Sequence, residues 1–327
     1  MEVIHDFMET LKQGGKQSHL NLALFPLLTA DGGDPDYLIL EEALAQGVVE
    51  IREVSEGGNV PDLKLINKSS KKVLVVDGEE LVGAKQNRIV NATFLIAGNT
   101  EVIIPVSCVE QGRWSYRTHK FASGEKVMPA AMRFVNQRSV AMNLKEGIGF
   151  RSDQGMIWNE LALKSERMAV HSATGAMTDL FEGQRDRLGE YHKAFRLVDC
   201  QAGAVFAING EIAGLECFGH QQTFGRFFQK LVQSYALDAL DWPGEEKEDR
   251  VPAASVRRFL EGVSRAPKKA YPSLGLGENV RVDGPFVSGA AMVHDGKVLH
   301  LSAFSRPGQK ESGTKVPLQR FSQRRKR

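Results

Sequence analysis

Two polar stretches of the chain hold most of the side chains that could do chemistry. The first, DGEELVGAKQNRIVN, covers residues 77–91, and the second, PVSCVEQGRWSYRTHKF, covers residues 105–121. Together they contain carboxylates, cations, a thiol and two flat aromatic rings. Because Arg and Lys bind phosphate oxygens and Trp or Tyr stacks on bases, this combination favours a phosphorylated or nucleotide-like ligand over an apolar one.

If the strands that carry these stretches pair, their ends meet and form one pocket wall. The candidate ligand-binding residues in them are Glu79, Lys85, Gln86, Arg88, Gln111, Arg113, Trp114 and Tyr116. The candidate catalytic residues are Glu80, Cys108 and Glu110; either glutamate could act as a general base or bind a ribose hydroxyl. The alternative is that Glu80, Lys85 and Arg88 form solvated cross-strand ion pairs, each contributing less than about 1 kcal/mol.

Cys108 ends an apolar strand and precedes Glu110 and Arg113, a setting that could expose the thiol and lower its pKa. A nucleophilic cysteine needs a base, and His119 is the nearest histidine in sequence. Free cysteines are also common as small buried hydrophobes, so both interpretations stay open.

Other site signatures are weak or absent. Cys217 and His220 have C-x-x-H spacing, which is only half of a zinc motif, so no metal site is expected. The chain has neither a phosphate-binding P-loop nor a G-x-S-x-G nucleophile motif, and no cofactor is indicated.

The elements that must position these residues indicate an α+β fold with mainly antiparallel sheets and a packed layer of helices. Closely spaced β-rich segments fill residues 48–108, too near one another for parallel crossovers. Apolar residues at helical spacing predict helices at residues 37–46, 129–144, 157–170, 178–196, 221–240 and 253–264. Residues 287–304 read as a hairpin turned at Asp295-Gly296.

We expect one large domain over residues 1–305, followed by a tail. The segments VLVVDGEELVGAK (73–85) and VFAINGEIAGLEC (205–217) are similar, so the domain could consist of duplicated halves at 15–128 and 129–305. Convergent hairpin chemistry explains the same similarity.

The charges are unevenly distributed. The chain of 327 residues has 42 Lys plus Arg and 40 Asp plus Glu, but residues 306–327 contain eight of the bases and one acid. The tail thus carries +7 and the preceding 305 residues −5. This excludes a uniformly basic nucleic-acid-binding body. The tail itself is expected to be disordered unless bound, with nucleic acid or an acidic protein as possible partners.

Three cysteines do not make a disulfide framework, and no apolar run reaches the roughly 20 residues of a membrane span. We therefore expect a cytoplasmic protein without a membrane segment, of undetermined oligomeric state.

Residues 76–116, together with GAVFAINGEIAGLECFGH (203–220), resemble the ARPP family, the ARG and rhodanese-phosphatase-superfamily-associated protein domain. The resemblance spans about residues 15–305 and does not include the tail. It implies a role near ADP-ribose or NAD-derived nucleotide metabolism, without an established activity. The matching positions are Glu79, Glu80, Gly83, Lys85, Gln86, Arg88, Cys108, Glu110, Gln111, Gly210, Glu211 and Glu216, which adds Glu211 and Glu216 to the candidate ligand-binding residues.

The resulting hypothesis is a domain that binds, and possibly processes, a nucleotide-derived ligand such as ADP-ribose. Lys85, Arg88 and Arg113 would hold phosphates, and Trp114 or Tyr116 would stack. The alternative is a non-enzymatic accessory protein that uses the same polar residues as a docking surface. A concave site would favour the first hypothesis and a flat one the second.

Overall fold

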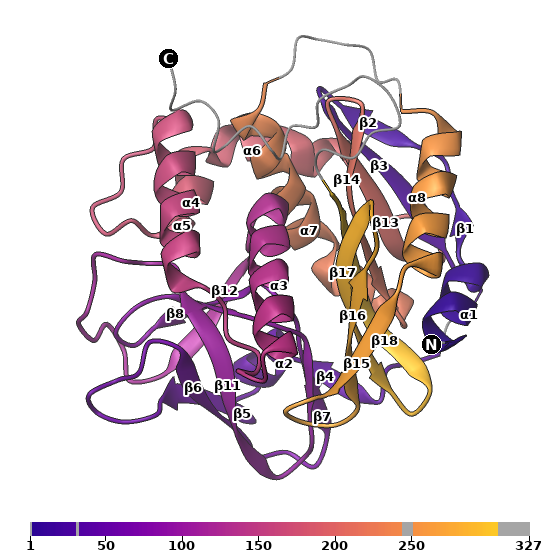
Figure 1. Cartoon of the computed structure of the whole chain (residues 1–327). Helices are drawn as coiled ribbons and strands as arrows, with labels where there is room; N and C mark the ends of the chain where they lie inside the picture. The colour runs from indigo at the N-terminus through magenta and orange to yellow at the C-terminus, as the bar shows by residue number, and fades with distance from the viewer. Residues whose placement is uncertain (1, 31–32, 244–250, 307–327) are drawn as a thin grey trace.

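The computed structural model describes residues 2–30, 33–243 and 251–306, which fold into three sheets and a set of covering helices (Figure 1). The described part is about equally helical and strand-forming, with mostly antiparallel pairing, so the predicted α+β class is confirmed. Among these residues no helix is both long and apolar enough to cross a membrane.

The largest sheet has nine strands from both ends of the chain and is antiparallel throughout. Its order is β1-β3-β13-β14-β18-β17-β16-β15, with β2 paired to β3. The strands are β1 (Lys12–Gln13), β2 (Gln17–His19), β3 (Leu22–Leu28), β13 (Gln201–Ile208), β14 (Glu211–Phe218), β15 (Lys268–Pro272), β16 (Glu278–Asp283), β17 (Val287–His294) and β18 (Lys297–Ser305).

Two smaller sheets come from residues 37–127. One has the order β12-β8-β9-β11-β6-β5 and the other β10-β7-β4, in which β4 and β7 are parallel. Their strands are β4 (Tyr37–Ile39), β5 (Val49–Glu53), β6 (Asp62–Asn67), β7 (Lys72–Val75), β8 (Glu79–Gly83), β9 (Arg88–Val90), β10 (Phe94–Ile96), β11 (Thr100–Cys108) and β12 (Phe121–Val127).

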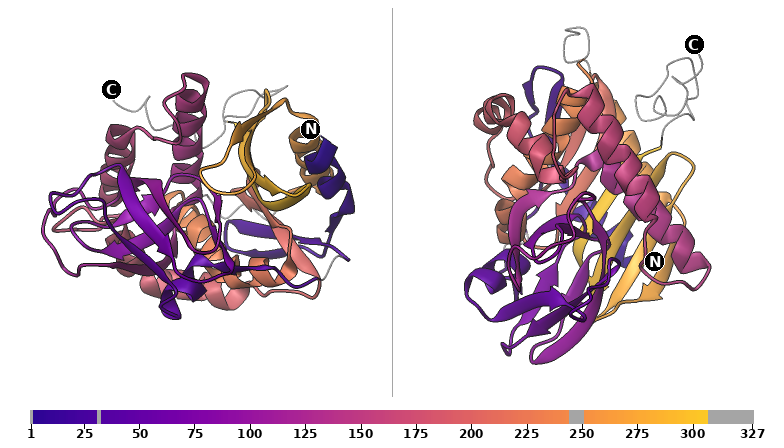
Figure 2. Two further views of the ribbon diagram at one scale, coloured as in Figure 1. Left: turned by 90° about the horizontal axis from the view of Figure 1, so that it is seen from below. Right: turned by 90° about the vertical axis from the view of Figure 1, so that its left-hand side faces the viewer.

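Helices cover both faces of the large sheet. One face packs its Val- and Leu-rich side chains against α1 and α8, whereas α7 and α3 lie on the other face, between it and the smaller sheets (Figures 1 and 2). The helices are α1 (Glu2–Thr10), α2 (Leu40–Ala45), α3 (Ala130–Lys145), α4 (Gln154–Arg167), α5 (Met177–Gly183), α6 (Arg185–Ala194), α7 (Gln221–Asp241) and α8 (Ala253–Arg265).

The predicted helices at 129–144, 157–170, 221–240 and 253–264 are confirmed, with shifted boundaries. The predicted helix at 178–196 is two helices, because the backbone leaves helical geometry at Gln184, whose N–H bonds Phe181 O at 3.3 Å in a tighter turn. The predicted helix at 37–46 begins only at Leu40, since residues 37–39 pair with β7.

The two similar segments at 73–85 and 205–217 differ in structure. The second is a hairpin in which β13 pairs with β14 across Asn209 and Gly210, both with positive φ. The first is not, because β7 pairs with β4 and β10 while β8 pairs with β9 and β12. The hairpin predicted at Asp295-Gly296, by contrast, is confirmed.

A buried ion pair lies between α3 and the large sheet. Arg133 of α3 donates from Nη2 to Glu216 Oε1 of β14 at 2.5 Å and from Nε to Met128 O at 3.2 Å. Tyr235 O–H also donates to Glu216 Oε1, at 3.0 Å. Burial alone would raise the pKa of Glu216, but Arg133 and His300 hold it below its ordinary value. The pair therefore fixes the position of α3 on the sheet.

Replacing Arg133 by Met should leave Glu216 buried without its cation and lower the free energy of unfolding by about 3–5 kcal/mol. Urea denaturation measures this change. Arg138→Met, on the same helix but exposed, is the matched control and should cost under about 1 kcal/mol. Equal, small effects of both substitutions would show that the ion pair does not hold the helix.

Candidate functional site

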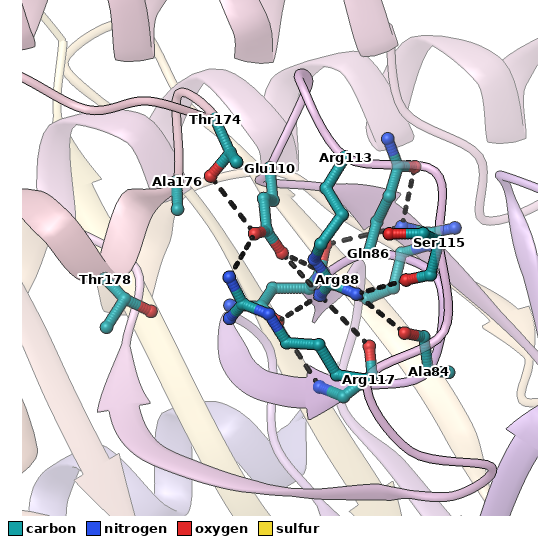
Figure 3. Close-up of polar contacts among 12 residues, drawn as sticks. Ala84, Gln86, Arg88, Glu110, Arg113, Ser115, Arg117, Thr174, Ala176 and Thr178 are labelled. Atoms are coloured by element: carbon teal, nitrogen blue, oxygen red, sulfur yellow. Dashed lines mark hydrogen bonds and ion pairs between the residues drawn. The ribbon is translucent and has the colours of Figure 1, made fainter.

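The two polar stretches of the sequence do meet, at the ends of three neighbouring strands. Strand β9 pairs with β11 so that Arg88 lies opposite Cys108, and with β8 so that Arg88 lies opposite Leu81. The turn between β8 and β9 and the segment after β11 then approach each other (Figure 3). We call Gln86, Arg88, Cys108, Glu110 and Arg113 the strand-end cluster.

Glu110 is the carboxylate that joins the two stretches. Its Oε2 accepts from Arg113 Nη2 at 2.6 Å and from the Asn87 N–H at 3.0 Å, and its Oε1 accepts from the Thr174 hydroxyl at 3.1 Å (Figure 3). Burial raises the pKa of Glu110, but these donors outweigh it and hold the pKa below its ordinary value. A carboxylate that is ionised and hydrogen-bonded on both oxygens has a structural role, and makes a poor general base.

Arg113 is also occupied within the protein. Its Nη1 donates to the carbonyls of Ala84 at 2.6 Å and Ser115 at 2.9 Å, and its Nη2 contacts Gly83 O and Asn87 Oδ1 as well as Glu110. The side chain is almost wholly buried. The prediction that Arg113 holds a ligand phosphate is therefore at odds with its contacts, which order the loop after β11.

Cys108 is buried, which argues against the first of its two interpretations, an exposed thiol with a lowered pKa. Burial is the main cause that raises the pKa of the thiol above its ordinary value. The Sγ lies 3.2 Å from Gln86 Oε1, and the backbone N–H and C=O of Cys108 both bond the Gln154 amide, at 2.7 and 2.8 Å. His119, the proposed base, is exposed and packs on Tyr116. The contacts favour the interpretation of Cys108 as a packed hydrophobe.

Arg88 is fully buried but only partly paired. Its Nη1 bonds Gln86 Oε1 at 3.0 Å and Asn87 O at 3.4 Å, whereas Nε and Nη2 have no hydrogen-bond partner among the described residues. Its Cζ lies 5.8 Å from the centroid of the Trp114 ring. Burial lowers the pKa of Arg88, with Cys108 and Glu53 opposing that effect.

An exposed face with two aromatic rings lies next to Arg88. Lys85 Nζ is 5.2 Å from the Trp114 ring and 5.0 Å from the Tyr116 ring, and it donates to Gly57 O at 2.8 Å. Trp114 is 48% and Tyr116 44% exposed. At Gly58, φ is +77° and a side chain would come within 3.1 Å of both Lys85 and Trp114. The backbone thus approaches these two side chains closely.

Glu79 and Glu80 are both buried carboxyls with a pKa raised to about 7, mainly by burial. Glu80 accepts from the Thr178 hydroxyl at 2.8 Å, and its Oε2 has no partner in the described part of the chain. Glu79 accepts from the Val76 N–H at 2.7 Å, which fits a role in the turn. A carboxyl with a pKa near 7 exchanges its proton readily at neutral pH. Of the two, Glu80 has an oxygen without a partner among the described residues, so Glu80 is the better candidate for proton transfer.

Three predicted residues are not part of this arrangement. Glu216 is in the buried pair with Arg133, and Glu211 lies at the start of β14, in the large sheet. Gln111 is exposed, and its backbone carbonyl is what accepts from Gln86, at 3.4 Å. Among the described residues, no group of three or more His, Cys, Asp or Glu side chains could hold a metal ion.

Sequence reasoning missed Thr174, Thr178 and Arg117. The segment that contains both threonines pairs with the chain after β11 through Glu110↔Ala176, which no sequence pattern indicated. Arg117 could have been found, because it lies in the second polar stretch. Its guanidinium is 3.5 Å from Glu110 Oε1, and its side chain is 61% exposed.

The raised pKa of Glu80 makes stability depend on pH. The pKa is about 7 in the folded protein against an ordinary value of 4.5, so folding favours the protonated form, and its stabilising contribution is lost as the pH rises through 7. Glu80→Gln cannot ionise. Its free energy of unfolding relative to wild type should rise by up to about 3 kcal/mol between pH 5 and pH 8.

Urea denaturation across that pH range measures the difference. The exposed Glu166→Gln on α4 is the control and should follow the wild-type pH dependence. A Glu80→Gln curve that runs parallel to wild type at every pH would contradict the raised pKa.

Burial also predicts which thiols react. Cys200 is exposed while Cys108 and Cys217 are buried, so one thiol should react quickly with iodoacetamide in the native protein and all three after unfolding in urea. Mass spectrometry of the labelled peptides counts them. Cys200→Ser should remove the fast reaction; fast labelling of Cys108 instead would show that it is accessible.

Comparison with known proteins finds a family model that matches this chain. No significant match is found among curated proteins or among solved structures. The family model of the ARG and rhodanese-phosphatase-superfamily-associated protein domain matches residues 10–304, which is most of the chain and includes both polar stretches and the β13–β14 hairpin. The chain therefore belongs to the ARG and rhodanese-phosphatase-superfamily-associated protein domain family.

Proposed function

We propose that the protein binds a nucleotide-derived phosphorylated ligand on the exposed face beside the strand-end cluster. The observation that carries the proposal is the pair of half-exposed rings, Trp114 and Tyr116. Both lie about 5 Å from Lys85 Nζ, and Trp114 also lies 5.8 Å from the incompletely paired Arg88. Aromatic rings next to cations suit a ligand with both a stacking base and phosphates.

Some of the cations near this face support the protein framework, and others are available to bind a ligand. The guanidinium of Arg113 is already hydrogen-bonded within the protein. We therefore assign the phosphate contact to Lys85 and to the exposed Arg117, in place of Arg113. Arg88 lies beneath, and its two unpaired nitrogens add positive potential there. We propose ADP-ribose as the first ligand to test, because the resemblance to this family implies ADP-ribose-related metabolism.

Processing of the ligand is the second part of the proposal, and Glu80 is its general acid or base. Glu80 lies on β8, opposite Ile89 of β9, and its side chain accepts from the Thr178 hydroxyl at 2.8 Å. Its pKa of about 7 suits proton transfer at neutral pH. We also propose a cytoplasmic location, in which the three free cysteines stay reduced.

Stacking on Trp114 predicts a specific pattern of binding. ADP-ribose should quench tryptophan fluorescence and bind more tightly than ribose 5-phosphate, which lacks the base. Trp114→Ala should weaken ADP-ribose binding by about 1–3 kcal/mol, roughly 5–150-fold, whereas Trp114→Phe should keep the affinity within a few-fold and lose most of the quenching. Isothermal titration calorimetry with parallel fluorescence measures both.

Trp242→Phe, at the far end of α7, is the control and should change neither affinity nor quenching by ligand. Absence of binding by wild type at millimolar ADP-ribose, NAD or nucleoside phosphates would overturn the proposal. Equal affinity of wild type and Trp114→Ala would move the ligand away from this face.

Two adjacent exposed rings also favour a second candidate function, an accessory protein that docks through this face. Aromatic residues are enriched in protein interfaces. In that case wild type binds none of these nucleotides, and Trp114→Ala changes self-association or partner binding in analytical ultracentrifugation instead.

A further inference from the structure

A second cationic region lies on different elements, in a cavity of about 420 Å³ between α3 and the end of the large sheet formed by β15, β16 and β17. That volume is in the range of small-molecule sites. Its charged lining residues are Arg138, Lys145, Lys268, Lys269, Arg281, Arg306 and a single acid, Asp283. The lining therefore has a formal charge of +5.

The one acid neutralises only part of this charge. Asp283 pairs with Lys145, at 2.9 Å, and with Arg306. Lys268 donates to the carbonyls of Ser264 and Ala266. Lys269 has its Nζ 5.1 Å from the ring of Tyr271. The cavity lining thus keeps a strong excess of positive charge.

Arg281 of β16 is a buried cation in the lining of this cavity. It is only 3% exposed, and all three of its guanidinium nitrogens lack a hydrogen-bond partner among the described residues. Its Cζ is 5.9 Å from the Phe150 ring. Asp77 is the acid that acts on it electrostatically, but both Asp77 oxygens already accept from the amides of Asn136 and Gln137. Burial accordingly lowers the pKa of Arg281 to about 10.

Two other buried polar atoms in the lining also have no hydrogen-bond partner in the part of the chain that the structure describes: the Tyr271 hydroxyl and Arg306 Nε. A buried unpaired guanidinium costs free energy that a well-packed apolar residue would avoid. Clustered with unpaired donors and excess cations around one cavity, it matches the donor set of an anion-binding site.

We propose that this cavity binds the phosphate group of a small phosphorylated molecule, with Arg281 and the Tyr271 hydroxyl as its buried donors and the exposed Arg138 and Lys269 at its entrance. A divalent phosphate supplies the negative charge and the several acceptor oxygens that these donors lack. The site shares no residue with the strand-end cluster or its exposed face, so it stands whether or not the proposed function there is correct.

Titration calorimetry of the full chain with sodium pyrophosphate tests the proposal, with sodium chloride added to keep the ionic strength constant. Wild type should bind pyrophosphate saturably, and Arg281→Met should weaken binding at least tenfold. Met is unbranched, reaches about as far as the Nε of Arg281 and removes an unpaired buried charge, so the variant is expected to fold. Lys193→Gln, an exposed lysine of α6, is the matched control for lost charge and should bind as wild type does.

A second variant keeps the test valid if Arg281→Met does not fold: Arg138→Gln with Lys269→Gln changes only the entrance and should weaken binding at least threefold. Trp114→Ala should leave pyrophosphate binding unchanged, which separates this site from the exposed aromatic face. The proposal is overturned if wild type does not bind pyrophosphate at 10 mM. It is equally overturned if the folded cavity variants bind as wild type does.

Discussion

Removing arginine side chains from water is the constraint on which much of this structure depends. Arg88, Arg133 and Arg281 are all nearly inaccessible, and a buried guanidinium without a partner is costly. Arg133 has a carboxylate, Glu216, and serves the fold by holding α3 against β14. Arg88 has partners for part of its guanidinium, and Arg281 has none by hydrogen bond among the described residues. The degree of internal pairing separates structural arginines from those suited to bind a ligand.

The same distinction explains the strand-end cluster. Glu110 and Arg113 satisfy each other and six backbone or side-chain groups around them, so they order the chain between β11 and β12. That order in turn supports Trp114, Tyr116 and Lys85 on the outside. Residue types that suggest catalysis from sequence are here divided between an internal framework and an exposed face, and the proposed function rests on the exposed face and Glu80.

The sequence predicted the fold class better than it predicted strand pairing or the environment of the site residues. Helical and strand periodicity predicted the α+β class and most helices, because the pattern depends on which face of an element is buried. The meeting of residues 77–91 and 105–121 was predictable from the closeness of their strands. The pairing of β7 and β8 with different partners was not, since an Asp-Gly turn looks the same in a hairpin and between sheets. The burial of Cys108 and the hydrogen bonding of Arg113 could not be predicted, because they depend on tertiary packing, including the segment that contains Thr174, far away in the chain.

The basic tail predicted to bind nucleic acid or an acidic partner lies almost wholly outside the described residues, so that prediction stays as it was.

The central claim is that a nucleotide-derived ligand binds on the face formed by Lys85, Trp114 and Tyr116. The most direct measurement is a crystal structure of the full chain with ADP-ribose. The account predicts the adenine stacked on Trp114 or Tyr116 and the diphosphate within hydrogen-bond distance of Lys85 or Arg117. ADP-ribose bound only elsewhere in the molecule, or no bound ligand at saturating concentration with this face free of crystal contacts, would contradict it.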